Sequence, residues 1–312
     1  MDLKEIFAQL NIFAHCREYE LPLWQCPQFL FVVMGIVTII ASLTTYVLGG
    51  HYIENPAIIA LIVLLLAVVM LIISFIIIQS FEKLAEANRM KSEFVRIVSH
   101  QLRTPLTNFK WALEFLLAKE DEGAQEDYFD ILKENSDRME ELVGDLIVVS
   151  RIKEGTLLLR KSNVDFGQLI NDVVTGLQSF TRARNIKINV QIEEDLPEIS
   201  TDPSQAKLVI ENLLKNAVSY SNPRGMVRVN LKKKNSCFYF SLEDEGIGIP
   251  EVDKKYIFKQ FFRARNVLQG KLKGSGLGLF ISKSIIQRLG GEIGFESEEG
   301  KGSTFWFTLP LK

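Results

Sequence analysis

The sequence of 312 residues predicts a multi-domain chain in which two membrane-spanning helices precede a helical bundle and a mixed α/β domain. Three observations predict this order. Between Glu20 and Glu54 the only side chain that can carry a positive charge is His51, and no charged residue lies between Glu54 and Glu82. Apolar residues then recur at helical spacing as far as residue 152. Strand-like and helix-like segments alternate from residue 156 onward.

Composition and charge narrow the classes of function. The formal net charge of −2 gives no general basic field, so nucleic acid is not expected as a partner. The three cysteines, Cys16, Cys26 and Cys237, are too few and too scattered for a disulfide framework, which predicts reduced thiols on the cytosolic side. His15 with Cys16 and Cys26 matches no established ligand spacing, so no metal site is expected there.

Two apolar segments, residues 29–48 and 57–78, each supply the roughly 20 residues that cross a bilayer. A buried core helix of this length would rarely lack a charged side chain. A cleaved signal peptide does not fit, because a second span follows directly. Basic residues flank the pair but are absent from residues 49–56, which predicts cytoplasmic termini. We therefore expect a multi-pass protein of the plasma (inner) membrane, in contact with lipid and with a partner membrane protein as one source of signal.

Residues 79–117 lack glycine and predict one long helix that leaves the second span. Its apolar positions alternate four and three apart, which is typical of a coiled-coil seam, and a second apolar line beside the seam favours a four-helix bundle. A second amphipathic helix is predicted over residues 124–152, so that two chains would complete the bundle. His100 lies on the opposite, charged face of the first helix, which argues against a role in the core.

Residues 99–107, with the sequence SHQLRTPLT, resemble the H box of sensor histidine kinases, whose histidine accepts the γ-phosphoryl group of ATP. The resemblance implies that His100 is the phospho-acceptor and that Thr104 positions water for dephosphorylation of a response regulator. The family usually has an acid where Gln101 stands. Gln101 is expected to act in catalysis by orienting His100, but it cannot remove the proton of that ring. Two explanations stay open: the site lacks the carboxylate, or another acid, such as Glu93 or one from the nucleotide-binding domain, takes that role.

The second half of the chain predicts helices on one face of a sheet. The expected strands are residues 156–161, 186–192, 226–234, 237–244, 292–297 and 303–309, and the expected helices are residues 166–181, 203–219 and 277–289. No GxxxxGK[ST] motif occurs, which excludes a P-loop enzyme. Glycine clusters at 244–248 and 274–278 would let backbone N–H groups approach phosphates, although surface turns explain either cluster alone equally well.

The order of four motifs decides between these interpretations. Residues 211–221 resemble the N box of the ATPase fold shared by gyrase, chaperone and histidine kinase proteins. Residues 244–248, 258–263 and 274–278 then resemble the first glycine box, the F box and the second glycine box. The resemblance covers about residues 80–312. It implies a dimeric four-helix-bundle histidine phosphotransfer domain and an α/β-sandwich ATP-binding domain of the histidine kinase/gyrase type.

The resemblance also implies roles for single residues. Asn216 would give a side-chain oxygen to Mg²⁺, with Asn212 supporting it from the preceding turn. Asp244 would accept a hydrogen bond from the adenine amino group. Ser219 stands where the family usually has Lys or Arg. The full set expected to bind ATP and Mg²⁺ is Asn212, Asn216, Tyr220, Asp244, Gly246, Gly248, Phe258, Arg263, Gly274, Gly276, Leu277 and Gly278, with Asn216 as the metal ligand.

A lid is implied over residues 263–276, with Arg263, Arg265, Lys271 and Lys273 as its available cations. The expected domains are a cytoplasmic N-terminal segment (1–28), the first span (29–48), a short extracytoplasmic loop (49–56), the second span (57–78), a signalling coiled-coil helix (79–90), a dimerisation and phosphotransfer domain (91–155) and a catalytic ATP-binding domain (156–312).

The function implied by the resemblance is that of a homodimeric sensor histidine kinase. It would phosphorylate His100 from ATP, pass the phosphoryl group to an aspartate in the receiver domain of a separate response regulator, and also act as a phosphatase toward that regulator. Two alternatives stay open: a nonenzymatic membrane scaffold, and an ATP-driven conformational machine of the gyrase or chaperone type. Acid-labile label from γ-labelled ATP indicates the kinase, free phosphate alone the ATPase, and neither the scaffold.

Overall fold

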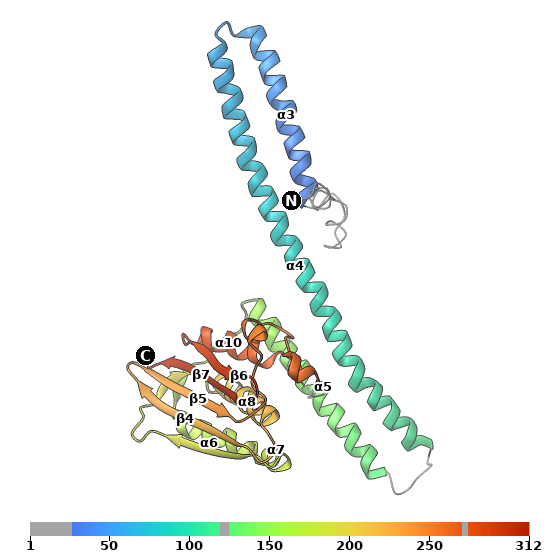
Figure 1. Ribbon diagram of the computed structural model, residues 1–312, viewed down its shortest axis with the longest axis vertical. Coiled ribbons are helices and arrows are strands. Elements are labelled where there is room, and N and C mark those ends of the chain that lie inside the picture. The colour runs from blue at the N-terminus through green and yellow to red at the C-terminus, as the bar shows by residue number, and fades with distance from the viewer. Residues whose placement is uncertain (1–26, 119–124, 270–273, 312) are drawn as a thin grey trace. The chain divides into compact units, whose positions relative to one another are not determined.

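A computed structural model describes residues 27–118, 125–269 and 274–311 (Figure 1). The chain separates into two compact units, Met1–His100 and Gln101–Lys312. Most of the N-terminal segment, with Cys16 and Cys26, lies outside the described residues, as do the lid cations Lys271 and Lys273.

The first unit contains helix α3, Pro27–Tyr52, and the part of helix α4, Pro56–Ala118, that precedes Gln101. Two stretches are long and apolar enough to cross a membrane: Phe29–Tyr52, with a mean hydropathy of 2.2, and Pro56–Ala85, with 3.6. Both predicted spans fall within these stretches. Most of their large apolar side chains are exposed, which is unfavourable in water and would be relieved in hydrocarbon.

The second unit begins with the remainder of α4, which continues through Pro105 as helix, and with α5, Gln125–Lys153. The two predicted helices are thereby confirmed to within a residue or two. Asn108 Nδ2 donates a hydrogen bond to Asn135 Oδ1 at 3.3 Å, and the ring of Phe115 stacks on Tyr128 with 5.1 Å between centroids. The loop predicted near residues 121–123 lies outside the described residues.

The α/β domain is built on a five-stranded sheet in the order β2-β4-β5-β7-β6, in which β2 and β4 are parallel and the other pairs antiparallel. Its strands are β2 (Lys187–Ile192), β4 (Met226–Lys234), β5 (Cys237–Asp244), β6 (Ile293–Glu298) and β7 (Gly302–Pro310). A separate antiparallel pair joins β1 (Ser162–Val164) to β3 (Ile199–Thr201).

Helices cover one face of this sheet (Figure 1), as the sequence predicts. They are α6 (Phe166–Gly176), α7 (Gln178–Ala183), α8 (Pro203–Tyr220) and α10 (Gly278–Arg288), while η3 (Glu251–Tyr256) and α9 (Arg265–Gln269) follow β5. Alternate residues of β5 point into the core beneath the helices, and Phe240 stacks there on Phe307 with 4.6 Å between centroids. Asp202 caps α8 by accepting hydrogen bonds from Ser204 N and Gln205 N.

Two expectations about local structure are corrected, and the short strands β1 and β3 have no counterpart among the expected strands. Residues 156–161 form no strand, because Arg160 N donates to the Asp202 carboxylate at 2.7 Å instead of to a neighbouring strand. The helix predicted over residues 166–181 is two helices, since the chain turns at Leu177 between α6 and α7. Strand β3 was not predicted, because three residues are too short to show a period.

The placement of the core predicts that alanine substitutions at two neighbouring residues of β5 lower the free energy of unfolding by different amounts. Phe240→Ala removes a fully buried ring and should lower the free energy of unfolding by about 3–5 kcal/mol. Tyr239→Ala is the matched control, because Tyr239 lies on the opposite sheet face, half-buried against Trp306, and should cost no more than about 1.5 kcal/mol. Urea unfolding of the detergent-solubilised chain, followed by circular dichroism, measures both, and equal losses would contradict this placement of the core.

Candidate functional site

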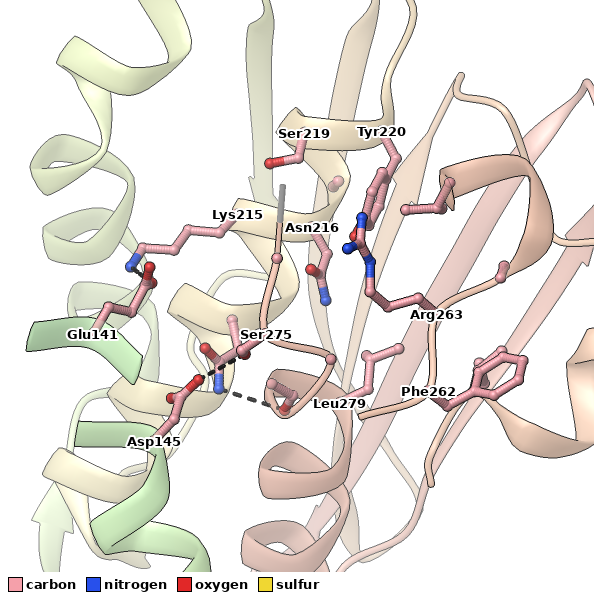
Figure 2. Close-up of a pocket in the computed structure, with 18 of the residues that line it drawn as sticks. Glu141, Asp145, Lys215, Asn216, Ser219, Tyr220, Phe262, Arg263, Ser275 and Leu279 are labelled. Carbon is pink, nitrogen blue, oxygen red and sulfur yellow. Dashed lines mark hydrogen bonds and ion pairs between the residues drawn. The ribbon is translucent and has the colours of Figure 1, made fainter. Parts of the chain in front are cut away.

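A cavity of about 710 Å³ lies in the second unit (Figure 2), within the size range of small-molecule sites. It is lined by α8, by the segments that follow β5, by the loop that precedes α10, and by residues of α5 and the adjoining part of α4. Of the aspartate and five glycines assigned from the two glycine boxes, five residues line it, namely Asp244, Gly248, Gly274, Gly276 and Gly278.

Helix α8 presents Asn212, Asn216 and Tyr220 to the cavity at intervals of one turn. This spacing is possible because the other face of α8 is buried, including Leu213 and Leu214. The Asn212 side-chain amide lies 3.5 Å from the carbonyl oxygen of Gly278, which ties α8 to the start of α10. The structure therefore brings the two asparagines together with the second glycine box, and their roles toward ATP and Mg²⁺ stay predictions.

Asp244 ends strand β5 as a buried carboxyl group at the cavity wall. Burial raises its pKa to about 6, although hydrogen bonds from the backbone N–H groups of Gly246 and Ser303 partly oppose this rise. The bond from Gly246 N to Asp244 Oδ1 is 3.0 Å long. At neutral pH this group is a desolvated hydrogen-bond acceptor, suited to an amino group of a ligand.

Two glycines of the cavity wall are required by backbone geometry. Gly248 has φ +61°, and a Cβ there would overlap the carbonyl oxygen of Glu298. Gly276 has φ +72°, and a Cβ there would lie 2.8 Å from the carbonyl carbon of Phe261. These positions allow the chain to pass closely around the cavity.

Tyr220 and Arg263 lie beside each other at the cavity (Figure 2). Burial raises the pKa of the Tyr220 hydroxyl, and the positive charge of Arg263 opposes that rise. Arg265, the other lid cation in the described part of the chain, pairs with Asp253: its Nε lies 3.6 Å from Asp253 Oδ1, and its backbone N donates to Asp253 Oδ2 at 2.9 Å. Among the lid cations that the structure describes, Arg263 is thus the one at the cavity.

Three of the predicted nucleotide-binding residues lie outside the cavity lining. Phe258 packs on Phe295 with 5.9 Å between ring centroids, under the Nζ atom of Lys283. Leu277 is fully buried. The backbone N–H of Gly246 donates a hydrogen bond to the Asp244 carboxylate, although Gly246 itself does not line the cavity. The structure assigns these residues to the support of the site, and their nucleotide contacts stay predictions.

The loop before α10 is hydrogen-bonded to both helices of the phospho-acceptor region. Ser275 Oγ donates to Asp145 Oδ2 at 2.9 Å and accepts from Leu277 N at 3.2 Å (Figure 2). Gln101 Nε2 donates to the Ser275 carbonyl oxygen at 3.0 Å. Burial raises the pKa of Asp145, while the hydrogen bond from Ser275 lowers it. None of these contacts has a local sequence signal.

The three H-box residues differ in their exposure and in their position relative to the cavity. Gln101 lines the cavity, whereas Thr104 is exposed on α4 outside its lining. His100 is exposed on α4 and belongs to the first unit.

Several residues that complete the cavity carry no sequence signal of their own. Its apolar wall comprises Ile247, Ile249, Ile257, Phe262, Val267 and Phe305, and further polar lining comes from Glu141, Arg184 and Lys215. The alternating burial of β5 and β7 predicts which face of the sheet is covered, but it does not show where the helices leave an opening.

Comparisons with known proteins agree with this geometry. Residues 201–312 match the family described as histidine kinase-, DNA gyrase B-, and HSP90-like ATPase, and residues 90–155 match the His Kinase A (phospho-acceptor) domain. Sensor protein GacS of Pseudomonas syringae pv. syringae is 32% identical over 231 residues, which are 72% of this chain and 26% of GacS. Sensor histidine kinase WalK of Bacillus subtilis (strain 168) is 32% identical over 239 residues, 74% of this chain and 38% of WalK.

The chain is also similar to a solved structure. Full-length ShkA, in complex with AMPPNP, superposes with a TM-score of 0.54 at 26% identity, over 70% of this chain and 46% of ShkA. The chain spans less than half of the length of each of these three proteins. A phospho-acceptor region precedes an ATPase region of the histidine kinase type, and the chain therefore belongs to the sensor histidine kinases of two-component systems.

Proposed function

We propose that this chain is a membrane-anchored, homodimeric kinase that binds ATP with Mg²⁺ in the described cavity and phosphorylates its own His100. The observation that carries the proposal is the convergence of Asn212, Asn216 and Asp244 on one cavity beside the glycine-rich loop. The same chain supplies an H-box histidine on α4. The phosphoryl group would then pass to an aspartate of a response regulator, toward which the chain would also act as a phosphatase.

The donor set fits a magnesium nucleotide. Asp244 is a desolvated hydrogen-bond acceptor. The amino group of adenine would donate to it the kind of hydrogen bond that an exposed carboxylate receives from water. Mg²⁺ prefers oxygen ligands and is commonly held by few protein groups together with phosphates and water, which suits the amide oxygen of Asn216. Backbone N–H groups of the loop Gly274–Gly278 and the start of α10 suit the phosphates.

The proposed reaction is an in-line displacement. A ring nitrogen of His100 forms a bond to the γ-phosphorus, the bond from that phosphorus to the bridging oxygen breaks, and ADP leaves with the electron pair. Mg²⁺ would neutralise charge that develops on the phosphate oxygens. The chain's own part is to hold the base of the nucleotide at Asp244 and the phosphates at the loop before α10, because positioning supplies much of the acceleration in such transfers.

Exposed apolar residues favour the dimer and the membrane anchor. On α4 and α5, Trp111 and Leu117 are 62% and 74% exposed in the single chain, and Phe129 and Ile147 are exposed as well. A second copy that completes a four-helix bundle would cover such residues. The two apolar helices would lie in the plasma (inner) membrane, and the basic flanks favour cytoplasmic termini.

The proposal predicts a separation of transfer from binding. His100→Ala should abolish acid-labile labelling of the chain by γ-labelled ATP, because the nucleophile is gone, and should leave ATP affinity within about twofold of the parent since no cavity residue changes. His51→Ala, at the end of α3, is the matched control and should be labelled like the parent. Acid-labile label on the His100→Ala variant would overturn the assignment.

The raised pKa of Asp244 predicts a pH dependence of ATP affinity. A donor on the adenine favours the ionised carboxylate, so binding lowers the pKa from about 6 and is strongest above pH 7. As the pH falls to 5, about nine-tenths of the free sites become protonated, and the Kd for ATP should rise roughly tenfold.

Asp244→Asn controls for titration of the nucleotide itself. Its amide oxygen still accepts a hydrogen bond but does not titrate, so the ratio of the parent's Kd to the variant's should rise as the pH is lowered from 7.5 to 5. Calorimetric titration of both proteins measures this ratio. A ratio that stays constant over this range would show that Asp244 does not contact the nucleotide in its ionised form.

A further inference from the structure

A site for a polyphosphate needs positive charge, and four cationic side chains line the described part of the cavity: Arg138, Arg184, Lys215 and Arg263. Lys215 Nζ is already paired with Glu141 Oε1 at 2.8 Å (Figure 2). Arg138 comes from α5, in the phospho-acceptor region. Arg184 comes from the ATPase domain itself but lies outside the four sequence motifs of that domain.

The sequence places Arg184 at the end of α7, yet the fold brings it to α8. Arg184 Nη1 donates a hydrogen bond to the backbone carbonyl oxygen of Ser219 at 3.2 Å, across 35 residues of sequence. Its guanidinium carbon lies 5.4 Å from the centroid of the Phe180 ring, so that a cation–π contact also holds the side chain. Ser219 lies between Asn216 and Tyr220 on α8, so Arg184 is held at the turn that carries both.

The bonding of Arg184 leaves its charge available. In the described parts of the chain its partners are a neutral carbonyl group and an aromatic ring, and no carboxylate there forms an ion pair with it. The guanidinium has five N–H donors, and the bond to Ser219 uses one. Its planar shape allows two parallel hydrogen bonds to a phosphate. Ser219 has only a hydroxyl group at the same place, so the turn has no cation of its own there.

We propose that Arg184 binds the phosphate groups of the nucleotide, so that the residue after α7 supplies the positive charge that α8 lacks at Ser219. This inference rests on the proposed function and names a phosphate-binding residue for that site. The carbonyl of Ser219 fixes the guanidinium against α8, and the remaining N–H groups donate to phosphate oxygens. Arg184 is thus a binding residue that comes from a different segment than the N-box motif.

The test compares nucleotides that share a base and differ in phosphates. In the full chain in detergent, Arg184→Gln should weaken binding of ATP with Mg²⁺ by about 10-fold or more, the usual effect of losing a charge-assisted hydrogen bond. Binding of adenosine should stay unchanged, because adenosine has no phosphate. Arg182→Gln is the matched control: Arg182 is exposed on the same helix, lies outside the cavity lining, and should leave both affinities unchanged.

A double variant distinguishes the effect of the Arg184 charge from a structural role of that side chain. Adding Ser219→Lys to Arg184→Gln places an ammonium group at the residue that Arg184 contacts, and should restore most of the lost ATP affinity. Equal weakening of ATP and adenosine by Arg184→Gln would show that Arg184 only holds α8 in place, and unchanged ATP affinity would show that it does not touch the phosphates. Either result overturns the inference while ATP binding by the parent stands. A parent that binds no ATP would instead overturn the proposed function together with it.

Discussion

Helix α8 packs its apolar side against the sheet and α10, and this burial sets the orientation of the polar groups that α8 contributes to the candidate site. Val209, Leu213 and Ala217 are almost completely buried, so the helix cannot rotate without exposing them. With that side fixed, Asn212 and Asn216 must face the cavity, because residues four apart share a face. The carbonyl of Ser219 is likewise fixed, and through it the position of Arg184. The chemistry therefore depends on an apolar contact that takes no part in it.

The cavity combines opposite electrostatic demands. At the end of β5, Asp244 is buried enough to raise its pKa to about 6, which makes it a strong acceptor for a neutral donor such as an amino group. Asp145, which also lines the cavity, contacts Ser275 in the loop that would hold phosphates, and its negative charge raises the free energy of another anion there. Cations at the cavity, Arg184 and Arg263 among them, offset this repulsion.

The sequence was most informative where the signal is local. The periods of β4, β5 and α8 predicted these elements nearly to the residue, and the glycine boxes with Asp244 predicted the cavity wall. The elements that were predicted wrongly or not at all have physical causes. The Arg160 backbone bonds a carboxylate distant in sequence, which removes a predicted strand, and β3 is too short to show alternation.

The contacts that complete the site are long-range. Ser275 meets Asp145 across 130 residues, and Arg184 meets Ser219 across 35, and neither pair forms a motif that could be read along the chain. Phe258 shows the converse limit. The F box predicts it at the nucleotide, and in the structure its ring packs on Phe295 outside the cavity lining, whereas Phe262 of the same motif lines the cavity. The nucleotide contact of Phe258 therefore stays a prediction.

In the proposed reaction, this cavity delivers the terminal phosphoryl group of ATP to a histidine of the same protein. This is tested by incubating the purified full chain with Mg²⁺ and ATP labelled either at the γ- or at the α-phosphorus. We expect acid-labile, base-stable label on the protein from γ-labelled ATP and none from α-labelled ATP. Release of free labelled phosphate with an unlabelled protein, or equal labelling from both nucleotides, would contradict it.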